Sequence, residues 1–302
     1  MNVRFDGQVA ILTGAGSGLG RCYALELSSR GAKVVVNDLA VLPDGESRAQ
    51  KTVEAIRLRG GEAVANCDNV ADPKSADRIA AAAMDHFGQV DILINNAGII
   101  RDKSFLKMPM DDFEEVIRVH LLGSAYLTKA VFPIMRDANY GRILLTTSTA
   151  GLFGNFGQTN YSAAKLGLVG FMNALKLEGA KYNIKVNTIS PVAATGLAQG
   201  TFPEAISERI KPEWVASMAL YLVSDQCNAT GMILSAGGGY YSNVHIVEGQ
   251  GIRFASDSMA TPEGIAERFS DIIDMKDARH YDSATDNMLD VLAPLMNNQS
   301  SH

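Results

Sequence analysis

Short apolar runs rich in β-branched residues alternate with longer segments of helical periodicity along most of this chain. The alternation predicts right-handed β-α-β units that build one parallel sheet with helices on both faces. Seven strands are predicted, at Val9–Thr13, Lys33–Asn37, Ala63–Cys67, Ile92–Asn95, Arg142–Thr147, Lys185–Ile189 and Ile233–Ser235. The helices between them are predicted at Gly18–Arg30, Ser47–Arg59, Lys74–Phe87, Asp111–Arg136, Gln158–Tyr182 and Pro212–Ser224. The fold class is therefore α/β, with a doubly wound, seven-stranded sheet.

The alternating pattern ends near Gly237, about 65 residues before the end of the chain. We expect one domain over residues 1–240 and a C-terminal extension over residues 241–302 that packs on or covers this domain. Within the extension, Thr261-Pro262-Glu263 predicts a helix start, with the threonine as cap and the proline in the first turn.

Charge and composition exclude several classes of function. Hydrophobic residues make up 47% of the 302 residues and the net charge is −6, which argues against a sequence-independent grip on nucleic acid. The apolar runs are short and broken by charges, so no membrane partner is expected. Cys22, Cys67 and Cys227 lie far apart without metal-ligand spacing and indicate reduced core cysteines. We expect a cytoplasmic protein without a metal ion.

A glycine-rich loop follows the first predicted strand and opens the first helix. Its glycines, Gly14, Gly18 and Gly20, have the spacing Gly-x-x-x-Gly-x-Gly, with Ser17 and Leu19 between them. Glycine lets the backbone approach a pyrophosphate, and a helix N-terminus favours its negative charge. The segment therefore predicts the phosphate site of a Rossmann-type dinucleotide fold, although a simple tight turn is the structural alternative.

Asp38 ends the second predicted strand, where a carboxylate can accept hydrogen bonds from an adenosine ribose. The same charge would repel a 2′-phosphate, so Asp38 predicts NAD rather than NADP. No basic residue occupies Gly16 or Ser17, which agrees with NAD, whereas Arg21 at the helix start is the one conflicting signal.

Tyr161 and Lys165 lie four residues apart on a predicted helix, so both side chains share one face. A phenol accepts a proton at neutral pH only if nearby positive charge lowers its pKa, and Lys165 is placed to do so. Ser148 at the end of the preceding strand offers a hydroxyl that can hold a substrate oxygen. Taken alone, the pair could equally be an exposed helical pair.

In combination, these motifs resemble the short-chain dehydrogenase/reductase family, whose catalytic serine, tyrosine and lysine match Ser148, Tyr161 and Lys165 in order and spacing. The resemblance implies hydride transfer between a nicotinamide and a carbonyl or alcohol. It also implies further coenzyme contacts, with Lys165 at the nicotinamide ribose and Tyr161 beside it. The remaining implied contacts are Asp68, Asn69 and Val70 near the adenine, and Asn95, Ala97 and Gly98 near the nicotinamide ribose.

His120 departs from the family pattern, which usually has an asparagine at this point of the fourth helix, linked through water to the catalytic lysine. Imidazole can relay protons near neutral pH, so His120 is a candidate for this relay. A structural histidine is the alternative.

Two stretches indicate a particular subfamily. They are Asn95-Asn96-Ala97-Gly98-Ile99-Ile100-Arg101-Asp102-Lys103 and Gly154-Asn155-Phe156-Gly157-Gln158-Thr159-Asn160-Tyr161. They resemble the dehydrogenase part of type 2 peroxisomal multifunctional enzymes, a (3R)-hydroxyacyl-CoA dehydrogenase subfamily that also carries a 17β-hydroxysteroid dehydrogenase name. The implied reaction is oxidation of a (3R)-3-hydroxyacyl-CoA to a 3-ketoacyl-CoA with NAD.

Two alternatives remain open: a dehydrogenase of steroids or other secondary alcohols, and a nucleotide-sensing protein without catalysis. Family habit implies a homodimer or homotetramer packed through the helices that contain His120 and Tyr161. The loop at residues 193–210 is expected to determine the chain length or the ring system of the substrate. Its sequence predicts neither of these properties.

Overall fold

The computed structural model describes residues 2–195, 203–254 and 260–297. The chain divides into two compact units, Met1–Asn243 and Val244–His302. The predicted boundary after residue 240 thus lies three residues before the observed one. That the extension packs on the first unit stays a prediction.

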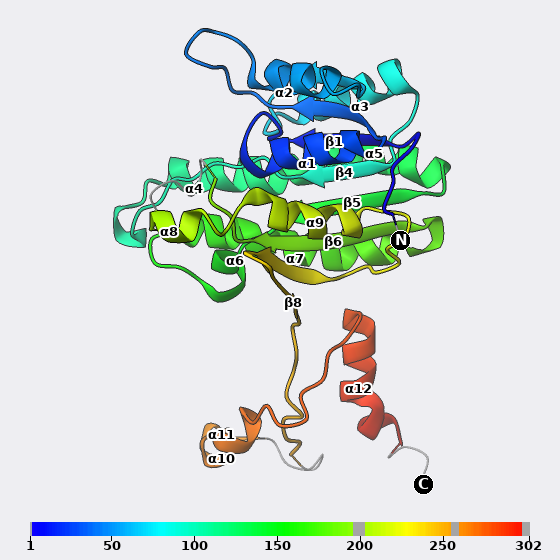
Figure 1. The fold of residues 1–302 in the computed structure, drawn as a ribbon. Helices are drawn as coiled ribbons and strands as arrows, with labels where there is room; N and C mark the ends of the chain where they lie inside the picture. Colours follow the sequence, from blue (N-terminus) through cyan, green and yellow to red (C-terminus); the bar gives the residue numbers. More distant parts are fainter. Residues whose placement is uncertain (1, 196–202, 255–259, 298–302) are drawn as a thin grey trace. The chain divides into compact units, whose positions relative to one another are not determined.

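Eight strands form one sheet in the order β3-β2-β1-β4-β5-β6-β7-β8 (Figure 1). Their bounds are β1 Val9–Thr13, β2 Lys33–Asn37, β3 Ala63–Asn66, β4 Ile92–Asn95, β5 Gly141–Thr146, β6 Ile184–Pro191, β7 Ile233–Gly237 and β8 Tyr240–Val244. All pairs from β3 through β7 are parallel. The parallel, doubly wound α/β fold is confirmed.

The predicted number of seven strands is wrong, because β8 adds an eighth strand beside β7. Gly238 and Gly239 join the two strands, with φ of +56° and +82°. Two consecutive residues with positive φ are typical of a tight hairpin turn. The strand β8 was not predicted because it is mostly exposed and polar and therefore lacks an apolar run.

Helices cover both faces of the sheet (Figure 1). The helices of the first unit are α1 Gly18–Ser29, α2 Arg48–Arg57, α3 Pro73–Phe87, α4 Met110–Ile117, α5 Gly123–Asp137, α6 Thr149–Phe153, α7 Thr159–Gly179, α8 Glu204–Ser207 and α9 Pro212–Leu222, with 3-10 turns η1 Phe105–Lys107 and η3 Ala180–Tyr182. One core layer joins α1, α2 and α9 to one face of the sheet. On the other side, α3 packs on α5, and α4 packs on α7. The strands β1, β2 and β4 are buried on both faces, which explains their continuous apolar runs.

The predicted helix Asp111–Arg136 is interrupted. A π-helical turn, η2 at Arg118–Leu122, separates α4 from α5 and contains His120. Such turns insert one extra residue into the helical ladder and often mark functional sites. Hydrophobic periodicity does not predict this π-helical turn, because the apolar pattern continues through α4 and α5 on either side of it.

The described residues of the second unit form the helices α10 Pro262–Glu267, α11 Phe269–Ile272 and α12 Ala284–Asn297. Thr261 caps α10 by accepting a hydrogen bond from the Gly264 N–H at 3.1 Å, which confirms the predicted helix start. A bridge between Glu248 and Arg279 closes the segment between them.

Candidate active site

The carboxyl ends of the parallel strands meet at one edge of the sheet, where the segments after β1 to β5 carry the predicted coenzyme contacts and Ser148. Tyr161 and Lys165 lie on α7, and His120 lies on η2. In the sheet register, Thr13 pairs with Asn37, and Asn37 pairs with Asn66. The strand order reverses between β1 and β4, so the connections after these strands leave to opposite faces. Ligands of doubly wound folds bind at such a switch point.

The glycine loop is packed too closely for side chains. Gly14 has φ +62°, and a Cβ there would lie 2.8 Å from the Cα of Ala97. A Cβ on Gly20 would lie 2.3 Å from the carbonyl oxygen of Gly14. Ser17, the N-cap of α1, makes no side-chain capping bond, which leaves the first N–H groups of α1 available to an anion. Loop and helix end therefore fit a dinucleotide pyrophosphate.

Asp38 lies beside this loop, as the sequence predicts. Its Oδ2 accepts a hydrogen bond from the Gly16 N–H and its Oδ1 accepts one from the Ala40 N–H, both at 2.9 Å. The two bonds hold the carboxylate at the end of β2, where an adenosine ribose would meet it.

Asp68, Asn69 and Val70 are occupied with structural contacts. The Asp68 carboxylate accepts hydrogen bonds from Asn66 at 2.8 Å and from Arg78 at 2.7 Å. Asn69 accepts a hydrogen bond from the Ala71 N–H at 2.9 Å. Val70 packs against Gly123 at the start of α5. Both readings of Asp68, adenine contact and turn aspartate, stay predictions.

The loop after β4 is connected to the end of β1 and the glycine loop through Asn96, which belongs to the predicted motif but not to its predicted coenzyme contacts. Asn96 Nδ2 donates to the Thr13 carbonyl at 3.1 Å, while the Thr13 hydroxyl accepts from the N–H groups of Asn96 and Ala97. Asn95 is buried and donates to the Thr128 hydroxyl at 3.3 Å. Asn95 thus supports the sheet, and Asn96 lines the cavity.

Ser148, Tyr161 and Lys165 line one cavity of about 450 Å³, as the family pattern predicts. Tyr161 shares a hydrogen bond with the Ser148 side chain. Lys165 Nζ donates to the Thr146 carbonyl at 2.5 Å and lies 5.5 Å from the centre of the Tyr161 ring. The spacing on α7 and the end of β5 therefore bring all three side chains together.

Burial is the largest cause of the pKa shifts of both Tyr161 and Lys165. It raises the pKa of Tyr161, against the lowering effect of the Ser148 hydrogen bond and with a further increase from the Asp102 charge. The sequence predicts a lowered pKa for Tyr161, so the raised pKa is opposite to that prediction. Burial also lowers the pKa of Lys165 to about 7, so the ammonium is readily deprotonated.

His120 lies at the inner side of this cavity and is only 2% exposed. Its ring meets the Tyr161 ring edge-on, with centroids 5.2 Å apart. Nε2 lies 2.8 Å from the Ile99 carbonyl oxygen and 3.0 Å from the Ile99 nitrogen, while Nδ1 is buried without a partner among the described residues. Burial, with a contribution from Lys165, lowers the pKa of His120 to about 3, so the imidazole is neutral at physiological pH.

Two of the cavity residues that precede Tyr161 have amide side chains, Asn155 and Gln158. Gln158 donates from Nε2 to Asp102 Oδ2 at 2.7 Å, and Asn155 donates to Gln158 Oε1 at 2.9 Å. Both line the cavity with Tyr161. In the sequence, these two residues stand out only because they belong to the stretch of residues 154–161, which carries the resemblance to the subfamily. Thr195, from the segment after β6, also lines the cavity, whereas residues 196–202 lie outside the described residues.

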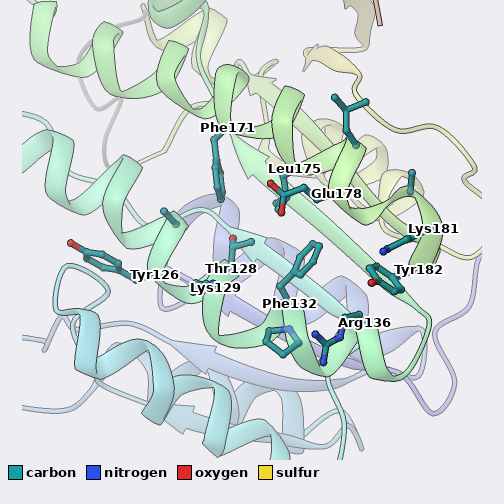
Figure 2. Close-up of a pocket in the computed structure, with 14 residues that line it drawn as sticks. Tyr126, Thr128, Lys129, Phe132, Arg136, Phe171, Leu175, Glu178, Lys181 and Tyr182 are labelled. Carbon is teal, nitrogen blue, oxygen red and sulfur yellow. The ribbon is translucent and has the colours of Figure 1, made fainter. Parts of the chain in front are cut away.

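A second cavity, of about 950 Å³, lies on the outer side of α5 and α7, away from these groups. Figure 2 shows side chains of both helices around it, including Phe132 of α5 and Phe171 of α7. Apolar and aromatic side chains dominate the lining, with charges such as Lys129 and Glu178 among them.

The structure also bears on cysteines, metals and membranes. Cys227 is buried, but Cys67 is exposed and Cys22 is half-buried, so the expectation of three core cysteines is wrong for Cys67. Among the described residues, no group of three His, Cys, Asp or Glu side chains is arranged to hold a metal ion. None of the described helices has the length and apolar character needed to cross a bilayer.

Comparison with known proteins gives consistent matches. The family model for short chain dehydrogenase matches residues 8–204. Peroxisomal multifunctional enzyme type 2 of Drosophila melanogaster is 42% identical over 97% of this chain and 50% of that protein. The full-length structure of that enzyme matches with a TM-score of 0.82 at 38% identity, over 97% of this chain and 51% of the other. The chain thus spans about half the length of this relative.

Two further relatives are covered over nearly their whole length. A short-chain type dehydrogenase/reductase of Mycobacterium tuberculosis is 44% identical, over 90% of this chain and 96% of that protein. A 7α-hydroxysteroid dehydrogenase, solved with NADH and 7-oxo glycochenodeoxycholic acid, matches with a TM-score of 0.72 at 32% identity, over 79% of this chain and 96% of the other.

Proposed function

This chain belongs to the short-chain dehydrogenase family, whose members act on CH–OH groups, and from that premise we propose that it oxidises (3R)-3-hydroxyacyl-CoA to 3-ketoacyl-CoA with NAD. The observation that carries the proposal is the convergence of Ser148, Tyr161 and Lys165 on one cavity beside the glycine loop. The substrate class is inferred from the 42% identity to the Drosophila multifunctional enzyme.

The glycine loop and Asp38 support NAD as the proposed coenzyme. Gly14, Gly18 and Gly20 leave room for the pyrophosphate, and the N-terminus of α1 favours its charge. Asp38 would accept hydrogen bonds from the adenosine ribose and repel a 2′-phosphate. Bound NAD supplies the hydride acceptor for the reaction.

Within the cavity, each catalytic side chain has its own task. Ser148 donates a hydrogen bond to the substrate oxygen and Tyr161 removes its proton as the carbinol carbon loses hydride. Lys165 stabilises the phenolate when its ammonium turns from the Thr146 carbonyl toward the ring, from which it is 5.5 Å away. Because burial raises the pKa of Tyr161, this contribution is needed for activity near neutral pH.

His120 has a narrower task than proton transfer through an imidazolium. With a pKa of about 3, the His120 side chain is a neutral imidazole at neutral pH and has no imidazolium proton to transfer. The buried Nδ1 is unpartnered among the described residues and belongs to a residue that lines the cavity, so it can instead hold a water by one hydrogen bond. We propose that His120 orders a water for the Lys165 relay and supports the Tyr161 ring.

A substrate panel tests the proposal. The purified enzyme is supplied with NAD and with (3R)- or (3S)-3-hydroxyacyl-CoA, and NADH formation is followed by absorbance. Turnover of the (3R) form alone is expected. Tyr161→Phe should lower kcat by at least about a hundredfold, since general-base catalysis contributes on that order, while coenzyme affinity stays unchanged.

A hydroxysteroid dehydrogenase is the second candidate, favoured by the match to the 7α-hydroxysteroid enzyme. Hydroxysteroids therefore form the other arm of the panel, and a preference for them would replace the acyl-CoA proposal. Tight NAD binding without turnover of any alcohol would favour the nucleotide-sensing alternative.

For assembly, we propose a homodimer or homotetramer in which a second copy covers the cavity on α5 and α7 (Figure 2). Its aromatic lining suits a self-complementary, isologous contact. Phe132→Asp should shift sedimentation toward smaller species. The extension at residues 241–302 is proposed to pack on the dehydrogenase domain, and the cytoplasm remains the proposed location, which cell fractionation would test.

A further inference from the structure

Three hydrogen bonds join residues 101–103, which follow the β4 loop, to residues 157–160, which lead into Tyr161. They are Lys103 N–H to Gly157 O at 2.9 Å, Gln158 Nε2 to Asp102 Oδ2 at 2.7 Å, and Asn160 Nδ2 to Arg101 O at 3.0 Å. We call this set of bonds the clasp. Because α7 begins at Thr159, the clasp fastens the first turn of the tyrosine helix to the loop beside the coenzyme site.

The hydrogen bond between Asp102 and Gln158 is the one bond of the clasp that joins two side chains, and it connects the clasp to the active cavity. Gln158 lines this cavity with Tyr161 and Ser148. Its amide is held at both ends, since Oε1 accepts from Asn155 while Nε2 donates to Asp102. A bond to an ionised carboxylate is stronger than a neutral one, so Asp102 is the anchor of this arrangement.

The charge of Asp102 is not neutralised by its basic neighbours. Arg101 and Lys103 flank it in sequence, yet both direct their cations to Asp112, at 3.8 Å and 3.1 Å. No ion pair joins Asp102 to a lysine or arginine among the described residues. A free negative charge near Tyr161 opposes the phenolate, and accordingly Asp102 contributes to the raised pKa of Tyr161.

Other groups that face Tyr161 come from three elements. Ser148, at the start of α6, shares a hydrogen bond with the phenol, and His120 of η2 is neutral. Lys165 lies one turn along α7 and has a pKa of about 7. Asp102 is therefore the one anionic group that acts on Tyr161 among the described residues.

We propose that Asp102 is a positioning residue with two effects: through Gln158 it sets the position of the tyrosine helix, and its negative charge, which the same hydrogen bond holds next to the cavity residue Gln158, opposes the phenolate of Tyr161. The inference rests on the proposed alcohol oxidation but not on the identity of the alcohol. It adds residues outside the catalytic serine, tyrosine and lysine to the control of the reaction.

Asp102→Asn separates the two effects, because its amide oxygen still accepts from Gln158 while the charge is lost. The rise of kcat/KM with pH should move to lower pH by roughly half a unit, the order expected for one unit charge across a partly solvated site. The shift should shrink at about 1 M salt, because Asp102 is exposed. Asp111→Asn removes an equal exposed charge nearby and should leave the profile in place.

Gln158→Ala tests the clasp with the charge retained. It should lower kcat by roughly 10- to 100-fold, the cost of a small misplacement of a catalytic group, with the pH midpoint kept near that of the parent. Circular dichroism checks that each variant is folded.

A second measurement needs no substrate. Carbon-13 NMR of ζ-labelled tyrosine, with the Tyr161 signal assigned by Tyr161→Phe, follows ionisation of the phenol directly. A lower titration midpoint in Asp102→Asn is expected even if no tested alcohol is oxidised, which separates this inference from the proposed function. Identical midpoints in Asp102→Asn and the parent would overturn the charge effect, and an unchanged kcat in Gln158→Ala would overturn the positioning effect.

Discussion

A Cβ atom placed on Gly98 would lie 2.3 Å from Cε1 of His120, closer than any side chain tolerates. The coenzyme loop after β4 and the π-helical turn η2 therefore meet through a glycine and a buried imidazole. This contact holds the His120 ring between Ile99 and Tyr161. The size of the residue at position 98 and the presence of histidine at position 120 are thus coupled.

Gly98→Ala should destabilise the fold by about 1–3 kcal/mol, because the added methyl group overpacks a closed contact. Urea unfolding measures the loss. In a His120→Ala background the same substitution should cost much less, since the clashing ring is gone. Gly170→Ala is the matched control, with open space around its Cβ in α7. Equal costs of Gly98→Ala in both backgrounds would contradict the coupling.

Lys165→Met should change how stability depends on pH. The pKa of Lys165 is about 7 in the fold and 10.5 in the unfolded chain, so between these values the unfolded state binds more protons. Parental stability should therefore rise with pH in this window relative to the variant, by up to about 1.4 kcal/mol per unit. Urea unfolding across the window, with exposed Lys107→Met as control, tests this; parallel pH curves for parent and Lys165→Met would refute it.

His120→Gln should reduce sensitivity to acid. The imidazole stays neutral in the fold down to a pH of about 3, whereas the unfolded chain binds a proton near pH 6.5. The unfolded state therefore binds more protons as pH falls below 6.5, and folded stability declines by up to about 1.4 kcal/mol per unit. The glutamine variant lacks this contribution, while His86→Gln, at an exposed site, should behave like the parent. A proton-induced shift of the His120 NMR signal near neutral pH would disprove the buried neutral state.

Asp38→Asn should relax the choice of coenzyme. The amide keeps one oxygen for the Gly16 N–H but loses the charge that repels a 2′-phosphate. We expect kcat/KM for NADP to rise by about tenfold and that for NAD to fall. Initial rates with both coenzymes provide the measurement, and Glu54→Gln on the exposed side of α2 is the charge control. A parent enzyme that already prefers NADP would show that Asp38 does not select the coenzyme.

The sequence was informative wherever function depends on neighbours along the chain. The strand-to-helix position of Gly14, Gly18 and Gly20 and the four-residue spacing of Tyr161 and Lys165 are local patterns with one geometric meaning. The parallel direction of the strands followed from the alternation of short apolar runs with helical segments, since parallel strands need a crossover between them.

Tertiary structure decided what depends on contacts between distant segments and on burial. The pairing of Asp102 with Gln158 joins residues 56 positions apart, and the Lys165 ammonium is directed to a carbonyl 19 positions away. Burial reversed the expected direction for the Tyr161 pKa and neutralised His120. Periodicity shows which residues share a helix face or strand, but the dielectric around a group and its partners across the fold arise only when the whole sheet and its helices have packed.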